Sequence, residues 1–199
     1  MKLFDKLYAY VWGKAFRDSS NTYIIKDEVV VIIDPGRYKS YTNLFGLMRN
    51  DRIDVRDIEV VLNTHMHLDH CESNSMFLNR GALLSFHEKE NVNIKPDIKP
   101  SSLEREIDVE IIHTPGHTPG SITIYLPEYE TAITGDLIFE NGIPGRIDLY
   151  GGNRKDMIRS LEIVQSYEPR YILPGHGRIM EGKRGINALF DKAITLLEY

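Results

Sequence analysis

Short runs of apolar residues alternate with longer amphipathic segments along the whole chain. Residues 23–25 and 29–33 are apolar and flank the polar triplet Lys26-Asp27-Glu28, a pattern that predicts two paired strands around a turn. The same criterion predicts further strands at residues 58–62, 83–86, 109–112 and 171–173, and a hairpin from residues 121–126 and 131–134.

Three segments show helical spacing instead. The first, at about residues 41–49, follows the strand breaker Asp34-Pro35-Gly36. The other two each present one apolar face, which indicates packing against a core. These faces consist of Met157, Ile158, Leu161 and Val164, and of Ile186, Leu189, Phe190, Ala193, Ile194 and Leu197. Alternating strands and helices predict a layered α/β or α+β fold, with residues 91–105 as an exposed connection.

The order strand, turn and helix occurs twice, once in each half of the chain. In the first half a strand leads to Asp34 and a later strand leads to His70; in the second half strands lead to Asp136 and His176. Two such halves would bring polar side chains from several strand ends into one cleft between two sheets.

Composition narrows the class of protein. The 199 residues suggest one domain, 1–199, since domains average about 150 residues. The single cysteine, Cys71, excludes an intramolecular disulfide. A net charge of −5 without a basic block disfavours nucleic-acid and membrane partners, so we expect a small-molecule substrate. No signal-peptide pattern opens the chain, and the longest apolar run, residues 29–33, is too short for a membrane span, so we expect a cytoplasmic location.

The strongest chemical signal follows the strand predicted at residues 58–62. Residues 63–70 read Asn-Thr-His-Met-His-Leu-Asp-His. His65 and His67 are two apart at the end of a strand and so point to the same side, and Asp69 and His70 follow where the chain turns. Imidazoles and a carboxylate gathered in this way supply ligands suited to Zn²⁺ or another first-row metal.

Three more polar residues stand in glycine-containing turns next to predicted strands. His117 lies in residues 114–121, Asp136 follows Gly135, and His176 lies in the Pro-Gly-His-Gly segment of residues 174–177. Such turns can aim a ligand without crowding a metal ion. Motifs for serine, P-loop or dinucleotide chemistry are absent from the sequence, so metal-assisted hydrolysis is the primary interpretation.

These motifs together resemble the metallo-β-lactamase superfamily. The resemblance implies a four-layer αββα sandwich with a dinuclear metal site. It implies that one metal is bound by His65, His67 and His117, that the second is bound by Asp69, His70 and His176, and that Asp136 bridges the two. Asp69 and Asp136 are then catalytic as well as metal-binding, and Asp34 supports the histidine loop from behind. Two divalent ions are expected, with zinc first and iron or manganese as alternatives.

The loop after Asp136 is similar to that of glyoxalase II-like thioester hydrolases and of persulfide dioxygenases. Because the chain ends soon after His176, the resemblance is to compact glyoxalase II-like proteins without a C-terminal helical domain. A hydroxide held between two metals would then hydrolyse a thioester. Arg146 is a candidate contact for an anionic substrate, and a loop-fastening pair with Asp148 is the alternative role.

Other functions stay open at this stage. A persulfide dioxygenase would use mononuclear iron on His65, His117 and Asp136. A β-lactamase-like, ester or phosphodiester hydrolase and a metal-stabilised binding protein without catalysis are further alternatives. The oligomeric state is not indicated by the sequence.

Overall fold

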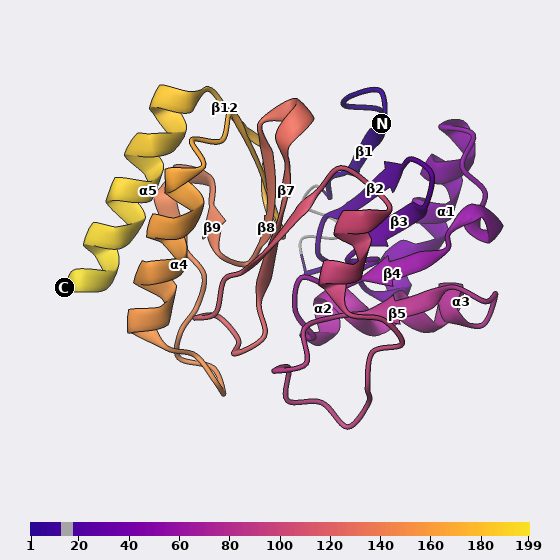
Figure 1. Ribbon diagram of the computed structural model, residues 1–199, viewed down its shortest axis with the longest axis horizontal. Helices are drawn as coiled ribbons and strands as arrows, with labels where there is room; N and C mark the ends of the chain where they lie inside the picture. Colours follow the sequence, from indigo (N-terminus) through magenta and orange to yellow (C-terminus); the bar gives the residue numbers. More distant parts are fainter. Residues whose placement is uncertain (13–17) are drawn as a thin grey trace.

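The computed structural model describes residues 1–12 and 18–199, and two five-stranded sheets packed face to face form its centre (Figure 1). The strand order of the first sheet is β1-β2-β3-β4-β5. Its first three strands are antiparallel, whereas β3, β4 and β5 are parallel. The strands are β1 (Leu7–Tyr10), β2 (Thr22–Lys26), β3 (Val30–Ile33), β4 (Val60–Leu62) and β5 (Leu83–Ser85).

The second sheet has the order β12-β11-β8-β7-β6. Strands β8 and β11 are parallel, and the remaining neighbours are antiparallel. The strands are β6 (Glu110–His113), β7 (Ile122–Leu126), β8 (Thr131–Gly135), β11 (Tyr171–Pro174) and β12 (Met180–Glu181). A separate two-stranded ribbon pairs β9 (Ile138–Phe139) with β10 (Ile143–Pro144).

Helices cover the outer faces of both sheets. On one side lie α4 and α5, and on the other lie α1 and α3 (Figure 1). The α-helices are α1 (Tyr38–Asn50), α2 (Leu68–Cys71), α3 (Ser75–Leu78), α4 (Arg154–Ser166) and α5 (Lys183–Glu198). Short 3₁₀ helices are η2 (Val55–Asp57), η3 (Glu72–Asn74), η4 (Pro100–Arg105), η5 (Pro127–Tyr129) and η6 (Glu140–Gly142). The order helix, sheet, sheet, helix confirms the predicted αββα sandwich.

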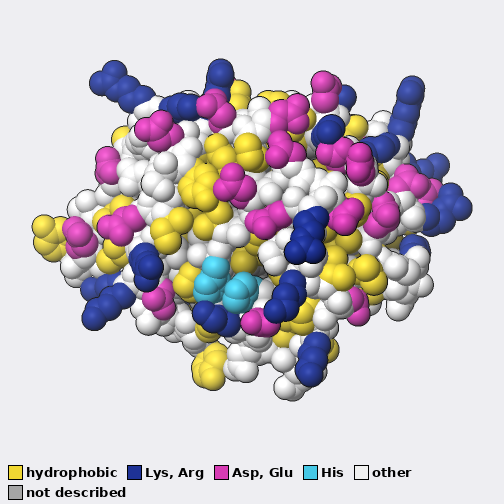
Figure 2. Space-filling view, viewed as in Figure 1, with side chains coloured by type: hydrophobic (Ala, Val, Ile, Leu, Met, Phe, Trp, Pro, Cys, Tyr) yellow, Lys and Arg dark blue, Asp and Glu magenta, His cyan; other side chains and the backbone are white. Residues whose placement is uncertain are grey.

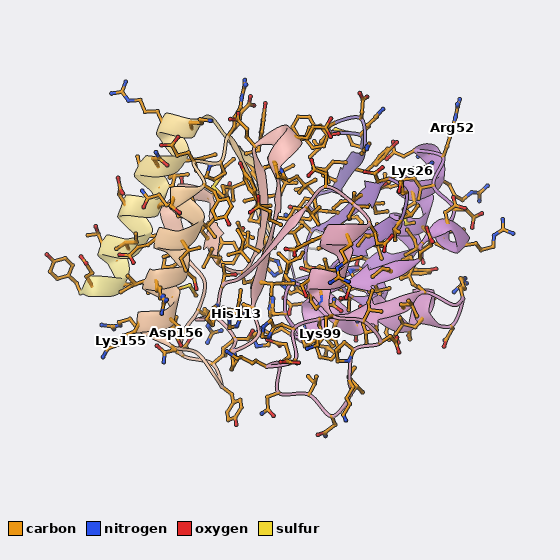
Figure 3. The ribbon with its side chains drawn as sticks, in the orientation of Figure 1. Lys26, Arg52, Lys99, His113, Lys155 and Asp156 are labelled. Atoms are coloured by element: carbon orange, nitrogen blue, oxygen red, sulfur yellow. The ribbon has the colours of Figure 1, made fainter. Side chains whose placement is uncertain are left out.

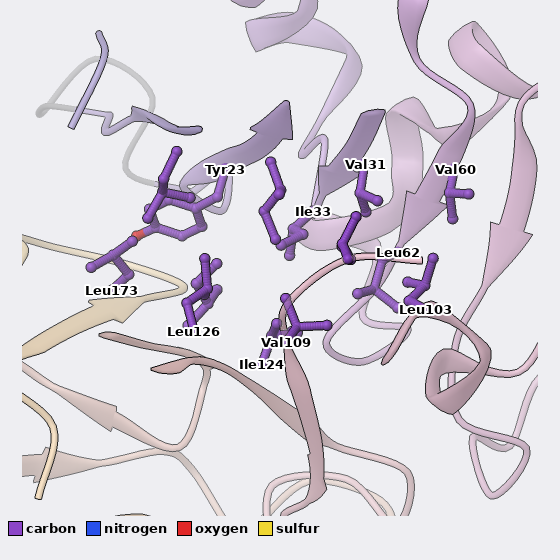
Figure 4. Packing of buried hydrophobic residues seen from close by; sticks show 14 of the residues in the cluster. Tyr23, Val31, Ile33, Val60, Leu62, Leu103, Val109, Ile124, Leu126 and Leu173 are labelled. Carbon is purple, nitrogen blue, oxygen red and sulfur yellow. The ribbon is translucent and has the colours of Figure 1, made fainter. Parts of the chain in front are cut away.

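The layer between the two sheets is an apolar core (Figure 4). Alternate residues of β3 face opposite ways, so Val31 and Ile33 enter this layer, whereas Ile32 packs toward α1 and α3. Burial on both faces explains why β3 is a continuous apolar run. A polar link also crosses the layer: the buried Tyr23 hydroxyl donates a hydrogen bond to the Pro174 carbonyl oxygen at 2.7 Å.

Most predicted elements are present with small shifts of their ends. Both predicted hairpins exist, as β2–β3 and β7–β8. The N-terminal strand β1 was not predicted. The prediction of an exposed connection at residues 91–105 is wrong in part, because Pro100 and Leu103 of η4 are buried and Leu103 joins the core between the sheets. An apolar residue without apolar neighbours in the sequence can still be buried in the folded protein, and no periodic pattern predicts that burial.

Across residues 1–12 and 18–199, none of the helices combines the length and apolar character needed to cross a bilayer.

Candidate metal centre

The candidate site lies where parallel strands of both sheets end. Asp34 directly follows β3, and the histidine-rich loop follows β4. In the second sheet, Asp136 directly follows β8, and His176 lies two residues beyond β11. Carboxyl ends of neighbouring parallel strands meet at one edge of a sheet, so this topology brings together side chains that are far apart in the sequence.

Three imidazoles form the first group. The Nδ1 atom of His67 lies 3.1 Å from Nε2 of His65 and 2.9 Å from Nε2 of His117. These nitrogens converge on one point, as nitrogens around a tetrahedral zinc ion do at separations of about 3.3 Å, given Zn–N bonds of roughly 2.0–2.1 Å. His117 donates its Nδ1 proton to the Arg146 carbonyl oxygen at 2.7 Å, which leaves Nε2 free to act as a ligand.

The second group contains a carboxylate and two imidazoles. Asp69 Oδ2 lies 3.0 Å from Nε2 of His176 and 3.9 Å from Nε2 of His70. His70 donates from Nδ1 to Asp34 Oδ2 at 2.8 Å, so its Nε2 is the nitrogen that faces the site and is available to a metal. Each of the two groups holds its ligand atoms within 4.8 Å of one another.

Asp136 stands between the two groups. Its Oδ2 lies 3.5 Å from Nε2 of His117, and its Oδ1 lies 3.3 Å from Nε2 of His70 and 3.8 Å from Nε2 of His176. The two oxygens of one carboxylate thus face different groups, which is the arrangement required of a bridging ligand.

Two atoms at the centre show that these residues fit a bound metal. His70 Nε2 and Asp136 Oδ1 are buried and form no hydrogen bond with any residue that the structure describes. Buried polar atoms without partners are costly, and a cation between them would satisfy both. A Cβ atom on Gly175 would overlap Asp136 Oδ1, so only glycine leaves room for the carboxylate at this position.

Comparison with known proteins places this site in a family. The Metallo-beta-lactamase superfamily profile matches residues 15–176 of the chain. The chain belongs to the metallo-beta-lactamase superfamily. It is 31% identical over 189 residues to a probable metallo-hydrolase of Methanocaldococcus jannaschii, and this match covers 81% of this chain and 89% of the relative.

Two further similarities concern function and fold. A probable hydroxyacylglutathione hydrolase of Schizosaccharomyces pombe is 30% identical over 158 residues, which cover 76% of this chain and 60% of that protein. The crystal structure of a metallo-beta-lactamase family protein from Thermus thermophilus superposes with a TM-score of 0.78 at 18% identity, over 99% of this chain and 81% of that chain. The predicted family is therefore confirmed, and the chain is a metallo-hydrolase of this superfamily.

Behind the centre of this metallo-hydrolase lies the buried carboxylate of Asp34, which the family resemblance implied to support the histidine loop. Its Oδ1 accepts the backbone N–H of Thr64 at 2.9 Å, and its Oδ2 accepts the Thr64 hydroxyl at 2.6 Å as well as the ring N–H of His70. One carboxylate therefore orients the chain next to His65 and the ring of His70.

Electrostatics in the metal-free site follow from burial and from neighbouring charges. Burial, together with the surrounding imidazoles, holds the pKa of His65 well below its usual value and lowers that of His67. Burial opposes charge on His70, but Asp136 and Asp34 outweigh it and raise the His70 pKa. Burial likewise disfavours ionised Asp69 and Asp136, but the adjacent histidines outweigh it and lower both pKa values. These carboxylates are ionised at neutral pH, as metal ligands must be.

The centre opens into a cavity of about 480 Å³. Besides metal-site residues, its lining consists of Leu68, Phe139, Leu149 and Arg146. Leu68 is 56% exposed and Leu149 is 36% exposed, so the mouth presents apolar surface beside the candidate ligands. Arg146 forms a two-pronged ion pair with Asp148, with nitrogen–oxygen distances of 2.9 and 2.8 Å.

The other histidines and the cysteine lie outside the two groups. His113 stacks on His87 with ring centroids 4.2 Å apart. Figure 2 shows histidine side chains on the viewed face between lysines and arginines, and Figure 3 labels His113 in the same region. The half-buried Cys71 directs its thiol to the Met66 carbonyl oxygen.

Sequence reasoning missed Glu90. This side chain is buried and accepts hydrogen bonds from the histidine loop and from the loop that carries His117. In the sequence it ends the charged run Glu88-Lys89-Glu90, which is typical of a solvated surface, so no local signal distinguishes it.

Proposed function

We propose that this metallo-hydrolase binds two divalent metal ions, zinc first, and hydrolyses a thioester. His65, His67 and His117 would hold one ion, Asp69, His70 and His176 the other, and Asp136 would contact both. The observation that carries this proposal is the position of Asp136, whose oxygens face different ligand groups at 3.3 and 3.5 Å. Imidazole and carboxylate ligands in this number suit zinc, with iron or manganese as alternatives.

Two such ions, when bound, would supply a hydroxide nucleophile at neutral pH and would polarise the bond that is attacked. The protein's own part is to present the ligand atoms in the required protonation state. Asp34 and the Arg146 carbonyl oxygen keep protons on the Nδ1 atoms of His70 and His117 and leave each Nε2 as a ligand. Asp69, which is partly open to the cavity, would also orient the attacking water as a hydrogen-bond acceptor.

A thioester substrate is supported by the similarity to the hydroxyacylglutathione hydrolase and by the lining of the mouth. Apolar Leu68, Phe139 and Leu149 would contact the apolar part of an acyl thioester. Arg146 would contact an anionic part of the substrate through the guanidinium N–H groups that Asp148 does not occupy. We propose a small-molecule substrate and a cytoplasmic site of action for this activity.

Metal content per chain, measured on protein purified without added metal or chelator, tests the centre. Near two equivalents are expected, and their removal by chelation is expected to abolish hydrolysis until metal is restored. One equivalent of iron together with oxygen uptake on persulfides would contradict the dinuclear hydrolase in favour of a dioxygenase.

Hydrolysis of a thioester panel that includes S-lactoylglutathione tests the reaction. We expect turnover by the wild type and a loss of at least about 100-fold in kcat for Asp69→Ala, because removing a metal ligand removes the activated nucleophile. Asp5→Ala is the matched control, because it removes an exposed carboxylate that is distant in sequence from the candidate ligands. Turnover of lactams or phosphodiesters in place of thioesters would overturn the substrate assignment.

A further inference from the structure

Glu90 is a buried carboxylate between the two loops that carry the three-imidazole group. Its side chain is 9% exposed. Oε2 accepts the backbone N–H of Met66 at 2.8 Å. Oε1 accepts the backbone N–H of Gly120 at 3.0 Å and the hydroxyl of Thr118 at 2.5 Å.

Two of these three donors come from immediate neighbours of the candidate ligands, and the third, Gly120, lies three residues after His117. Met66 lies between His65 and His67, and Thr118 directly follows His117. One side chain therefore joins the two segments whose imidazoles must meet at a single point. The convergence of His67 Nδ1 on the other two rings, at 2.9 and 3.1 Å, depends on the spacing of these segments.

The contacts at this position require a carboxylate. All three neighbours are donors, and they are divided between both oxygens of Glu90. A glutamine would offer one accepting oxygen and would turn an NH₂ group toward at least one N–H donor. Packing around Oε1 is close, because a Cβ atom on Gly120 would lie 2.6 Å from both Oε1 and the backbone nitrogen of Glu90.

No described lysine, arginine or histidine forms an ion pair with Glu90. The three hydrogen bonds are the polar contacts that stabilise its carboxylate. Charge-assisted bonds of this kind are among the stronger ones, so the carboxylate holds both loops more firmly than a neutral acceptor would. Asp34 stabilises the same histidine loop at other positions, where it contacts Thr64 and His70.

We infer that Glu90 is a positioning residue of the metal centre, which sets the geometry and affinity of the ion held by His65, His67 and His117. Its effect is directed at this ion, whereas Asp34 contacts both Thr64, next to His65, and the ring of His70. This inference rests on the proposed dinuclear centre. Partners that orient the ligands of a metal typically change metal affinity by about 10–100-fold when they are removed.

The test is a Co²⁺ titration of chelated full-length protein, followed by visible absorption, with Glu90→Gln compared to the wild type. We expect a loss of about 10–100-fold in affinity at the three-imidazole site and an altered absorption band for that ion, with the second site much less affected. Glu88→Gln is the matched control, because it makes the same chemical change two residues away at a side chain that is 68% exposed. Asp34→Asn, at a carboxylate that contacts both Thr64 and His70, is expected to weaken both sites.

Equal affinities and spectra in Glu90→Gln and the wild type would overturn the inference, as would an equal loss at both sites. Failure of the wild type to bind two Co²⁺ ions would instead reject the proposed centre itself. If Glu90→Gln does not fold, Thr118→Val, which removes one donor to Oε1, takes its place. It is expected to weaken the same site by a smaller factor, and an unchanged titration of this variant would refute the role of Glu90.

Discussion

At the end of β3, the Asp34 carboxylate accepts hydrogen bonds from four buried donors: the Thr64 N–H, the Thr64 hydroxyl, the His70 ring and the Asn63 amide. Asp34→Ala would leave buried donors unsatisfied, at a cost of roughly 2–4 kcal/mol in the free energy of unfolding. Urea denaturation of the chelated protein measures this cost, with the exposed Asp5→Ala as control. A change below about 0.5 kcal/mol would mean that the loop holds its shape without Asp34.

Single substitutions at Arg146 and Asp148 can distinguish the two roles considered for Arg146, which are contact with an anionic substrate and fastening of the loop. The ion pair with Asp148 lies at the surface, so neither Arg146→Ala nor Asp148→Ala is expected to shift the unfolding temperature measurably. If Arg146 contacts an anionic substrate, Arg146→Ala raises KM for an anionic thioester and leaves KM for a neutral one unchanged, whereas Asp148→Ala raises neither. Equal KM changes in the two variants would identify the pair as a loop fastener instead.

At the scale of elements, a hydrogen bond links the two sheets beside the site. The Tyr23 hydroxyl on β2 donates to the Pro174 carbonyl oxygen at the end of β11, two residues before His176. Tyr23→Phe keeps the ring in the core and removes this bond, so we expect a loss of about 0.5–1.5 kcal/mol in the free energy of unfolding. Tyr150→Phe, at a side chain that is 83% exposed, should leave that energy unchanged. Identical urea midpoints for both variants would contradict this role for the bond between the sheets.

For the whole molecule, the pKa shifts predict how the stability of the chelated protein varies with pH. His65 and His67 have lowered pKa values, so below the ordinary value of 6.5 the unfolded chain binds more protons and stability falls as pH falls. The raised pKa of His70 acts in the other direction: its contribution is complete below pH 6.5 and is lost as pH rises through the higher folded value. The lowered pKa values of Asp69 and Asp136 add a further loss once pH falls below the ordinary value of 3.8.

We therefore expect the metal-free protein to be most stable near pH 6.5, as measured by its unfolding temperature in buffers from pH 4 to pH 9 with chelator present. The metal-loaded protein should lose stability mainly on the acid side, since protons compete with metal for the same ligands. A stability of the metal-free protein that rises steadily to pH 9 would show that His70 is not held in its charged form.

The features that could be predicted from the sequence are those marked by patterns among residues close together in the chain. Short apolar runs between polar or turn residues located β2, β3, β7 and β8, because strands that are buried on both faces need apolar residues at successive positions. The spacing from His65 to His70 and the turns at His117 and His176 marked the candidate ligands, since each stands beside a strand or in a glycine turn visible in the sequence. The same motifs were sufficient for the family, which the comparisons confirm.

Other features depend on partners that are distant in sequence. Strand β1 is defined by its pairing with β2, and Leu103 is buried because it meets the core between the sheets. In the sequence, Glu90 belongs to a charged run typical of a surface. In the folded protein, its two oxygens accept hydrogen bonds from the backbone of Met66 and Gly120.

The sequence by itself thus marked the candidate metal ligands and predicted the layered fold, because ligand chemistry and strand patterns are local properties, and its motifs carried the resemblance that implied the family. The family resemblance implied how these ligands are grouped and what Asp136 and Asp34 do, but only the tertiary structure decided how closely the side chains approach one another and that Glu90 joins the loops of His65 and His117. Distances between side chains more than a few residues apart are set by sheet pairing and packing, and these come into existence only when the whole chain folds.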